Sequence, residues 1–167
     1  HELMKKMGNE IACIIIEPIP ANNGLLLQDK YFLECLRKKC YKYGALLIFD
    51  EVISGLRVGF EGAAHHYGVQ PDILTYGKII GGGLPVGAYG ASHEIMGHVA
   101  PDGPVYQAGT LSANPVAMSA GYAALEQLLE PNFYEDLKLK TQGFVNDILS
   151  FTEEHNMEIS IPTIGSI

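Results

Sequence analysis

The sequence predicts an α/β protein with a mostly parallel sheet and flanking helices. Three apolar runs, ACIIIEP, ALLIFDEV and DILTYGKIIGGG, alternate with helical stretches, and each has a charged residue where its strand should end. Such runs are typical of neighbouring parallel strands that are buried on both faces and whose carboxyl ends open onto one crevice. We therefore expect Glu17, Asp50 and Lys78 to lie around that crevice.

The first strand is predicted within residues 11–17, because Pro18 and the turn-forming residues 20–24 follow the apolar run. Asp29 is placed to cap the next helix, in which apolar residues recur at helical spacing. Four basic residues precede the glycine that ends this helix, and we interpret them as compensation of the helix dipole rather than as a binding patch. They are Arg37, Lys38, Lys39 and Lys42.

The second and third strands are predicted over residues 45–49 and 73–76. The segment between them, which includes a short helical piece ending at Tyr67, is long enough for a right-handed crossover, so the two strands should be parallel. Residues 88–91 are a candidate fourth strand, after which Ser92 is placed to cap a helix.

The last third of the chain is predicted to form two helices and a strand. Asn114 and Pro115 predict a helix start, and this helix should end near residue 129, before Pro131. Asn132 with Glu135 resembles a capping box and predicts a longer helix toward residue 154, followed by a strand over 158–161. We place a domain boundary near residue 130, which separates residues 1–130 from residues 131–167.

Composition narrows the functional classes. The 167 residues are 47% hydrophobic and 18% charged with a net charge of −8, which predicts a compact α/β protein and disfavours nucleic acid as a partner. No apolar stretch approaches the roughly 20 residues that span a bilayer, so we expect no membrane association. The expected location is the cytoplasm, with a processed organelle protein, such as one of a plastid, as the alternative. The three cysteines are expected to be thiols, and no Cys or His spacing matches a zinc pattern, so no structural metal is predicted.

Lys78 and Asp50 are the candidate catalytic residues. We expect Lys78, which lies among Tyr76, Ile79 and Ile80, to be sequestered from solvent and to react as a nucleophile with aldehydes. Asp50 follows five apolar residues, where a carboxylate needs a cationic partner such as a protonated pyridine nitrogen. A Schiff-base lysine with an aspartate on the ring nitrogen is typical of pyridoxal phosphate sites. The alternative is a structural ion pair between Lys78 and Asp50.

The glycine-rich segments do not form a nucleotide-binding motif. In residues 77–83, Lys78 precedes the three consecutive glycines 81–83 and no hydroxyl residue follows it, which is the wrong order for a P-loop. The spacing of a dinucleotide fingerprint is also absent. Gly109 and Thr110, ahead of the Asn114 helix, offer a hydroxyl and backbone amides to a phosphate. The alternative is that Thr110 is an ordinary turn residue.

Four segments carry a family resemblance: IIIEP, LLIFDEVISGLRV, DILTYGKIIGGGLPVGAYG and VYQAGTLSANPVAMSAG. Together they resemble the class III aminotransferases of pyridoxal-phosphate fold type I, in that family's order and over most of residues 11–125. The resemblance implies that residues 1–130 are the C-terminal half of a cofactor-binding large domain. Residues 131–167 would be the beginning of a small C-terminal α+β domain, in a chain less than half as long as family members.

The resemblance also implies roles for individual residues. Lys78 would form the Schiff base with pyridoxal 5'-phosphate and later move a proton, Asp50 would keep the ring nitrogen protonated, and Val52 would pack under the ring. Gly109 and Thr110 would bind the cofactor phosphate of a neighbouring subunit, which implies a homodimer with a shared active site.

Asn22 bears on the type of reaction. It occupies the position where many transaminases of the family carry glutamate and where the family's aminomutases carry asparagine, and it would contact the substrate. The resemblance therefore implies an intramolecular amino-group transfer on a small molecule, with the cofactor passing through its pyridoxamine form. Two alternatives remain: an aminotransferase with an external amino donor, and, for these 167 residues alone, a noncatalytic core that cannot retain the cofactor.

Overall fold

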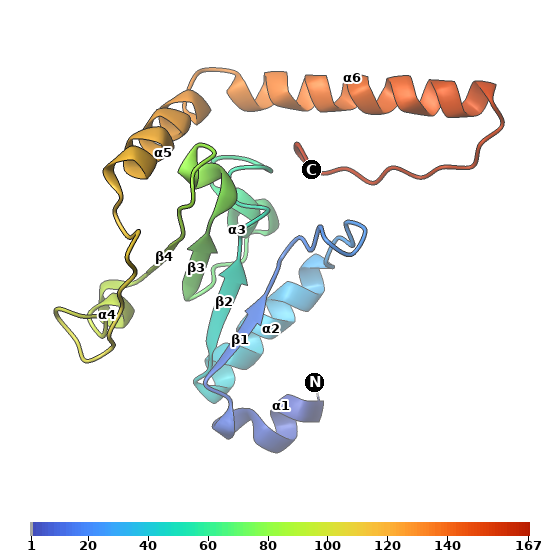
Figure 1. Ribbon diagram of the computed structural model, residues 1–167. Helices are drawn as coiled ribbons and strands as arrows, with labels where there is room; N and C mark the ends of the chain where they lie inside the picture. The colour runs from blue at the N-terminus through green and yellow to red at the C-terminus, as the bar shows by residue number, and fades with distance from the viewer. Residues whose placement is uncertain (1) are drawn as a thin grey trace.

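A computed structural model describes residues 2–167, and its centre is one four-stranded sheet (Figure 1). The strands are β1 (Cys13–Ile16), β2 (Leu46–Asp50), β3 (Ile73–Tyr76) and β4 (Ala88–Ala91), in the order β1-β2-β3-β4. The pairs β1–β2 and β2–β3 are parallel, whereas β4 runs antiparallel to β3. The predicted α/β class with a mostly parallel sheet is confirmed.

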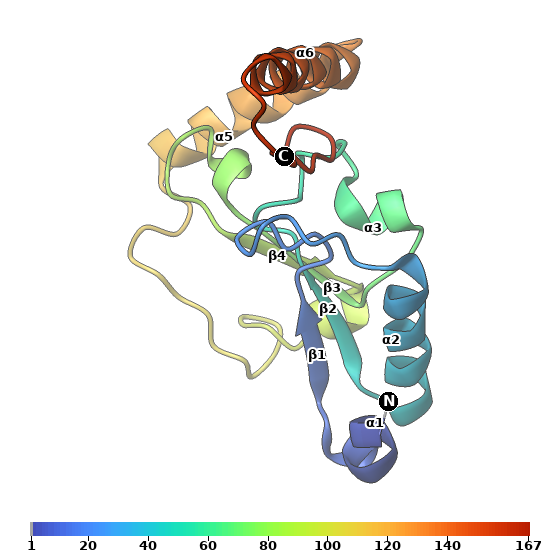
Figure 2. The same cartoon turned by 90° about the vertical axis from the view of Figure 1, so that its right-hand side faces the viewer.

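Helix α2 (Lys30–Tyr43) packs against one face of the sheet (Figure 2). It begins where predicted, because the Asp29 carboxylate accepts a hydrogen bond of 2.7 Å from the amide of Tyr31. It ends at Gly44, which has a left-handed backbone with φ +69°. Leu33 and Cys40 of this helix meet Leu47 and Phe49 of β2 in the buried core. Apolar burial between α2 and β2 therefore fixes the central strand that ends at Asp50.

The prediction that the strands are buried on both faces is wrong for β1. Cys13 is exposed and Ile15 is 61% exposed, whereas the alternate residues Ile14 and Ile16 are half-buried. Successive side chains of a strand point to opposite faces, and within residues 2–167 only one face of β1 is covered. An apolar run shows that a strand can be buried on both sides, but it cannot show which segment covers each side.

Short helices connect the strands. Helix α1 (Glu2–Met7) and the 3-10 helix η1 (Gly8–Glu10) precede β1 and were not predicted. Helix α3 (Gly62–Tyr67) lies in the crossover between β2 and β3, as expected. The 3-10 helix η2 (Lys78–Gly81) follows β3, and α4 (His93–Met96) follows β4 with Ser92 as its cap.

Helix α5 (Pro115–Leu128) begins as predicted, with the side chain of Asn114 accepting hydrogen bonds from the amides of Val116 and Ala117. It packs directly on η2: a β-carbon on Gly82 would collide with the carbonyl of Ala120, and one on Gly121 with the carbonyl of Ile80. The turn that begins at Lys78 therefore rests on the backbone of α5.

Helix α6 (Phe133–Glu154) confirms the predicted second helix, but two details of that prediction are wrong. Asn132 has a left-handed backbone with φ +66° and makes no capping hydrogen bond, so there is no capping box. Residues 158–161 form no strand, because no neighbouring strand pairs with them in the region that the structure describes. The domain boundary near residue 130 stays a prediction.

The last residues return from α6 to the body of the molecule (Figure 1). Ile164 and Ile167 pack against the core cluster, and the Ser166 hydroxyl accepts a hydrogen bond of 2.8 Å from the Arg57 guanidinium. Across residues 2–167, no helix is both long and apolar enough to cross a membrane. Nor does that stretch contain three or more His, Cys, Asp or Glu residues grouped to hold a metal ion.

Candidate active site

Asp50 is the last residue of β2 and marks the carboxyl edge of the sheet. Its Cα is in register with that of Thr75 in β3, and the ladder continues one step further through a hydrogen bond of 3.0 Å from the Glu51 amide to the Thr75 carbonyl. The carboxylate of Asp50 is half-buried and accepts a hydrogen bond of 3.0 Å from the amide of Val52. The strand end and the following turn therefore orient this carboxylate.

Lys78 begins the turn that follows β3, and its backbone is unusual. Its φ is +48°, in the left-handed region that residues other than glycine seldom adopt. Such conformations persist where the surrounding structure enforces them, and they cluster at functional sites. Lys78 lines an open hollow of about 590 Å³ together with Ile79 and residues 83–86. The strained turn thus presents an amine at the mouth of a hollow.

The expectation that Lys78 is sequestered from solvent is wrong for this chain. Its side chain is exposed, and so are Gly83, Leu84 and Pro85 on the far side of the same hollow. Ile79 is half-buried and lines the hollow beside Lys78, whereas Ile80 is half-buried against residues of α5. Apolar neighbours in a sequence do not shield a side chain when the turn directs it away from them.

Asp50 and Lys78 do not pair with each other. In the stretch from residue 2 to residue 167, no ion pair within 4.0 Å joins them, so the alternative of a structural ion pair is not what the structure shows. Adjacent parallel strands lie about 5 Å apart, and the three residues from Thr75 to Lys78 span at most about 11 Å, so the two Cα atoms are within roughly 16 Å. The carboxylate of Asp50 and the amine of Lys78 thus belong to neighbouring segments at one edge of the sheet, and they are not paired with each other.

Val52 lies against the segment that carries Lys78. A β-carbon on Gly77 would come within 3.2 Å of Cγ1 of Val52, so the isopropyl group of Val52 packs on the backbone immediately before the lysine. Carboxylate, apolar surface and amine are therefore contributed by three adjoining segments at one edge of the sheet. This donor set suits a flat group with a cationic nitrogen at one end and a carbonyl at the other.

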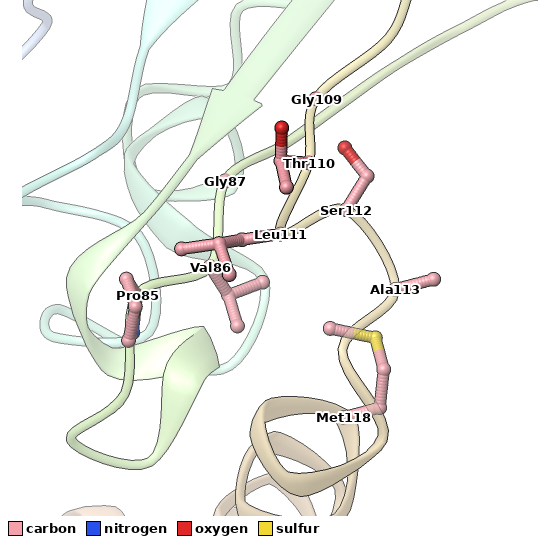
Figure 3. Close-up of a pocket in the computed structure, with 9 residues that line it drawn as sticks. All are labelled: Pro85, Val86, Gly87, Gly109, Thr110, Leu111, Ser112, Ala113 and Met118. Carbon is pink, nitrogen blue, oxygen red and sulfur yellow. The ribbon is translucent and has the colours of Figure 1, made fainter.

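Gly109 and Thr110 line a second hollow, of about 420 Å³, shown in Figure 3. The hydroxyl groups of Thr110 and Ser112 lie on the same side of it, near Gly109, while Met118 lies at the opposite end. The amides of Val116 and Ala117 at the start of α5 are already bonded to Asn114, so among the polar side chains of this hollow the two hydroxyls are the groups that it offers an anion. The structure does not bring Thr110 into the hollow of Lys78, although Pro85 and Val86 border both.

Asn22 lies in the exposed turn after β1. Because β1 and β3 flank β2, the turn is at the same carboxyl edge as Asp50 but on the side away from Lys78. Glu17, one residue after β1, is half-buried at this edge too. The ends of three parallel strands therefore lie along one edge of the sheet with Asp50 in the middle, but neither Asp50 nor Glu17 lines the hollow of Lys78.

Sequence reasoning missed Glu51. Its side chain is only 1% exposed, and it accepts hydrogen bonds from Ser54, Ala63 and Ala64. Two of these donors are backbone amides more than ten residues away, so no pairing of residue types in the sequence could reveal them. The available signal was a second acidic residue directly after an apolar strand, where an unpartnered charge is costly.

A lysine in a strained turn and an aspartate at the end of the neighbouring parallel strand are characteristic of pyridoxal-phosphate-dependent transferases. The family model described as aminotransferase class-III matches residues 1–167, and the chain belongs to this family. The predicted resemblance is confirmed.

The chain is 52% identical over 166 residues to the glutamate-1-semialdehyde 2,1-aminomutase of Desulforudis audaxviator, which covers 99% of this chain and 38% of that protein. A solved transaminase with PLP bound shares 33% identity with a TM-score of 0.90 over 98% of this chain and 39% of its own. An omega-transaminase from Sphaerobacter thermophilus shares 38% identity with a TM-score of 0.90 over 98% of this chain and 38% of its own. The chain thus spans about two fifths of the length of these proteins, and the predicted fold type is confirmed.

Proposed function

We propose that the protein carrying this chain is a glutamate-1-semialdehyde 2,1-aminomutase. It would move the amino group of glutamate 1-semialdehyde from carbon 2 to carbon 1 and give 5-aminolevulinate for tetrapyrrole synthesis, without consuming an amino donor. One observation carries the proposal: the chain is 52% identical to a protein of that name over 99% of its length. Its identity to the two transaminase structures is lower, at 33% and 38%.

We propose pyridoxal 5'-phosphate as the cofactor, alternating with its pyridoxamine form. When bound, this cofactor supplies an electron sink and an aldehyde that condenses with amines. Lys78 would hold it covalently through Nζ and carry a proton between the two substrate carbons. The Asp50 carboxylate would hold the ring nitrogen protonated, and Val52 would pack against the ring. The unpaired state of Asp50 and Lys78 and the contact of Val52 with Gly77 support these roles.

A homodimer is part of the proposal. Gly109 and Thr110 would bind the cofactor phosphate held mainly by a neighbouring subunit, with residues 1–130 in the large domain and 131–167 beginning the small one. In support, Thr110 lines a hollow other than that of Lys78 and is exposed. The three free cysteines suit the reducing cytoplasm, or a plastid in a photosynthetic eukaryote.

The second candidate is an aminotransferase with an external amino donor, and the transaminase structures support it. Asn22, in the exposed turn after β1, is the residue that we propose to favour the aminomutase. The test is to incubate the protein in its natural length with glutamate 1-semialdehyde and no amino donor. Sustained formation of 5-aminolevulinate is the expected result, and turnover only after a donor is added would establish the alternative.

For residues 1–167 alone, we propose a noncatalytic core that does not retain the cofactor. The exposure of Lys78 supports this, because nothing in residues 2–167 shields a bound cofactor from water. Mass spectrometry after incubation with pyridoxal phosphate and borohydride would test it. A stoichiometric adduct on Lys78 of the isolated chain would refute this part of the proposal.

A further inference from the structure

We propose that Glu51 is a positioning residue of the site: its buried carboxylate closes the segment from residue 51 to residue 64 and thereby fixes the directions of Asp50 and Val52. The inference rests on the proposed function, since it assigns Asp50 and Val52 to the cofactor. It concerns a side chain that does not itself line the hollow of Lys78.

The hydrogen bonds of Glu51 satisfy both carboxylate oxygens. Oε2 accepts from the amide of Ala63 at 2.7 Å and from the hydroxyl of Ser54 at 3.2 Å, and Oε1 accepts from the amide of Ala64 at 2.9 Å. No cation lies within 4.0 Å of this carboxylate in the part of the chain that the structure covers. A buried carboxylate held only by neutral donors is stable when each donor is well placed, so its position is set by these three groups.

The backbone of Glu51 links both candidate segments. Its amide donates to the carbonyl of Thr75, three residues before Lys78, and its carbonyl accepts from the amide of Gly55 at 2.9 Å. The turn closed by this second bond contains Val52, which packs on Gly77. One residue thus joins the strand end that carries Asp50, the turn that carries Val52 and the strand that leads to Lys78.

The backbone at the start of α3 packs closely against the Glu51 carboxylate. Gly62 has a φ of +70°, and a β-carbon there would come within 3.0 Å of Cδ of Glu51. The start of α3 therefore lies directly over the side chain, and the amides of Ala63 and Ala64 can reach it. A rotation of Glu51 would have to move either α3 or the peptide shared with Asp50.

Asp72 offers a matched comparison. Its carboxylate also accepts a backbone hydrogen bond, at 2.7 Å from the amide of Leu47, but it lies at the opposite end of β2 and is paired with Arg37 at 2.7 Å. Asp72 therefore holds the same strand without touching the residues proposed to meet the cofactor. A purely structural function of Glu51 would make the two carboxylates equivalent in their effects.

The experiment uses the protein in its natural length, with Glu51→Gln, Ser54→Ala and Asp72→Asn as variants. Glutamine keeps the shape but turns a donor toward the Ala63 or Ala64 amide. We expect Glu51→Gln to weaken cofactor affinity roughly tenfold, by analogy with metal sites, where loss of an outer-shell partner has an effect of this size. It should also shift the pH titration of the bound cofactor's absorbance. Ser54→Ala, which removes one bond, should give a smaller change in the same direction, and Asp72→Asn should lower the Tm with an unchanged titration.

A titration and an affinity equal to wild type in Glu51→Gln, with only the Tm lowered, would overturn the inference. Should Glu51→Gln fail to fold, Ser54→Ala decides in the same way, because it leaves the carboxylate in place. A wild-type protein that forms no adduct at Lys78 would instead overturn the proposed function, and the inference with it. If the wild type forms the adduct and the Glu51 and Ser54 variants match it in cofactor affinity and pH titration, only the inference about Glu51 is refuted.

Discussion

The two edges of the sheet use their charged residues differently. At the amino edge of β2 and β3, the Asp72 carboxylate is satisfied by the Leu47 amide and the Arg37 guanidinium, so its charge is neutralised within the chain. At the carboxyl edge, Glu51 is satisfied by neutral donors, whereas Asp50 and Lys78 have no ion pair in the described residues. The charged groups at the amino edge therefore stabilise the fold, whereas the carboxylate of Asp50 and the amine of Lys78 at the carboxyl edge are free to contact a ligand.

Replacement of Lys78 by alanine should have the largest effect on this comparison. If Lys78 has its proposed roles in the protein of natural length, the covalent link to the cofactor and the proton transfer would both be lost, and we expect activity to fall by at least roughly 10³-fold. Mass spectrometry after borohydride treatment should show no adduct. Lys138→Ala, at an exposed position of α6, is the matched control and should leave adduct and activity unchanged. An adduct that persists in Lys78→Ala would contradict the assignment.

The next effect in size is expected for Asp50→Asn. Asparagine cannot hold a pyridine nitrogen in its protonated form by charge, so activity should drop on the order of 10²-fold. Because the amide oxygen can still accept the hydrogen bond from Val52, thermal unfolding should remain close to that of wild type. Steady-state kinetics and calorimetry together test this. A large loss of Tm with little loss of activity would place Asp50 with the structural carboxylates instead.

Asp72→Ala should have the converse effect at the amino edge. The substitution leaves the Leu47 amide and Arg37 without their partner, and about 2 kcal/mol of unfolding free energy should be lost. Denaturant titration measures this loss, and Arg37→Ala in a double-mutant cycle isolates the ion pair. Cofactor affinity should stay at the wild-type value, and a tenfold fall in affinity would break the proposed separation of the two edges.

The smallest effect concerns Tyr76, which precedes Lys78 by two residues. Burial, and to a lesser extent the negative charge of Glu51, raise the pKa of the Tyr76 phenol above its ordinary value of 10.0. A pKa raised by folding leaves stability intact below pH 10 and reduces it as the pH rises through the raised value. In Glu51→Gln, the pKa of Tyr76 should fall part of the way back toward its ordinary value of 10.0. NMR titration of labelled tyrosine measures this pKa, and Tyr76→Phe assigns the signal. An unchanged pKa would show that the charge of Glu51 does not act on this side chain.

The sheet was predictable because apolar runs and helix caps are local signals. The strand over residues 73–76 and the caps at Asp29, Ser92 and Asn114 follow from residue types alone. The strand expected over residues 158–161 failed because a strand also needs a partner, which local sequence does not specify. Prediction therefore succeeded for elements whose signals lie within their own residues. It failed for the strand over 158–161, which needs a second segment to pair with.

The candidate site shows the same contrast between features that local sequence predicts and features that depend on other segments. Position at a strand end identified Asp50 and Lys78, since parallel strands bring such residues to one edge. The exposure of Lys78 was missed because it depends on the left-handed turn and on what covers the hollow. Glu51 was missed because its partners are amides of the backbone, and every residue except proline carries one.

The contact between η2 and α5 has a consequence for how this sequence can vary. At Gly82 and Gly121 the two backbones meet so closely that even a methyl group would force them apart, and the lysine would be displaced with its turn. Neither glycine has a functional side chain, yet we expect substitution of either one to be selected against as strongly as substitution of Lys78. Natural variants of the protein should therefore tolerate almost no replacement at these two glycines.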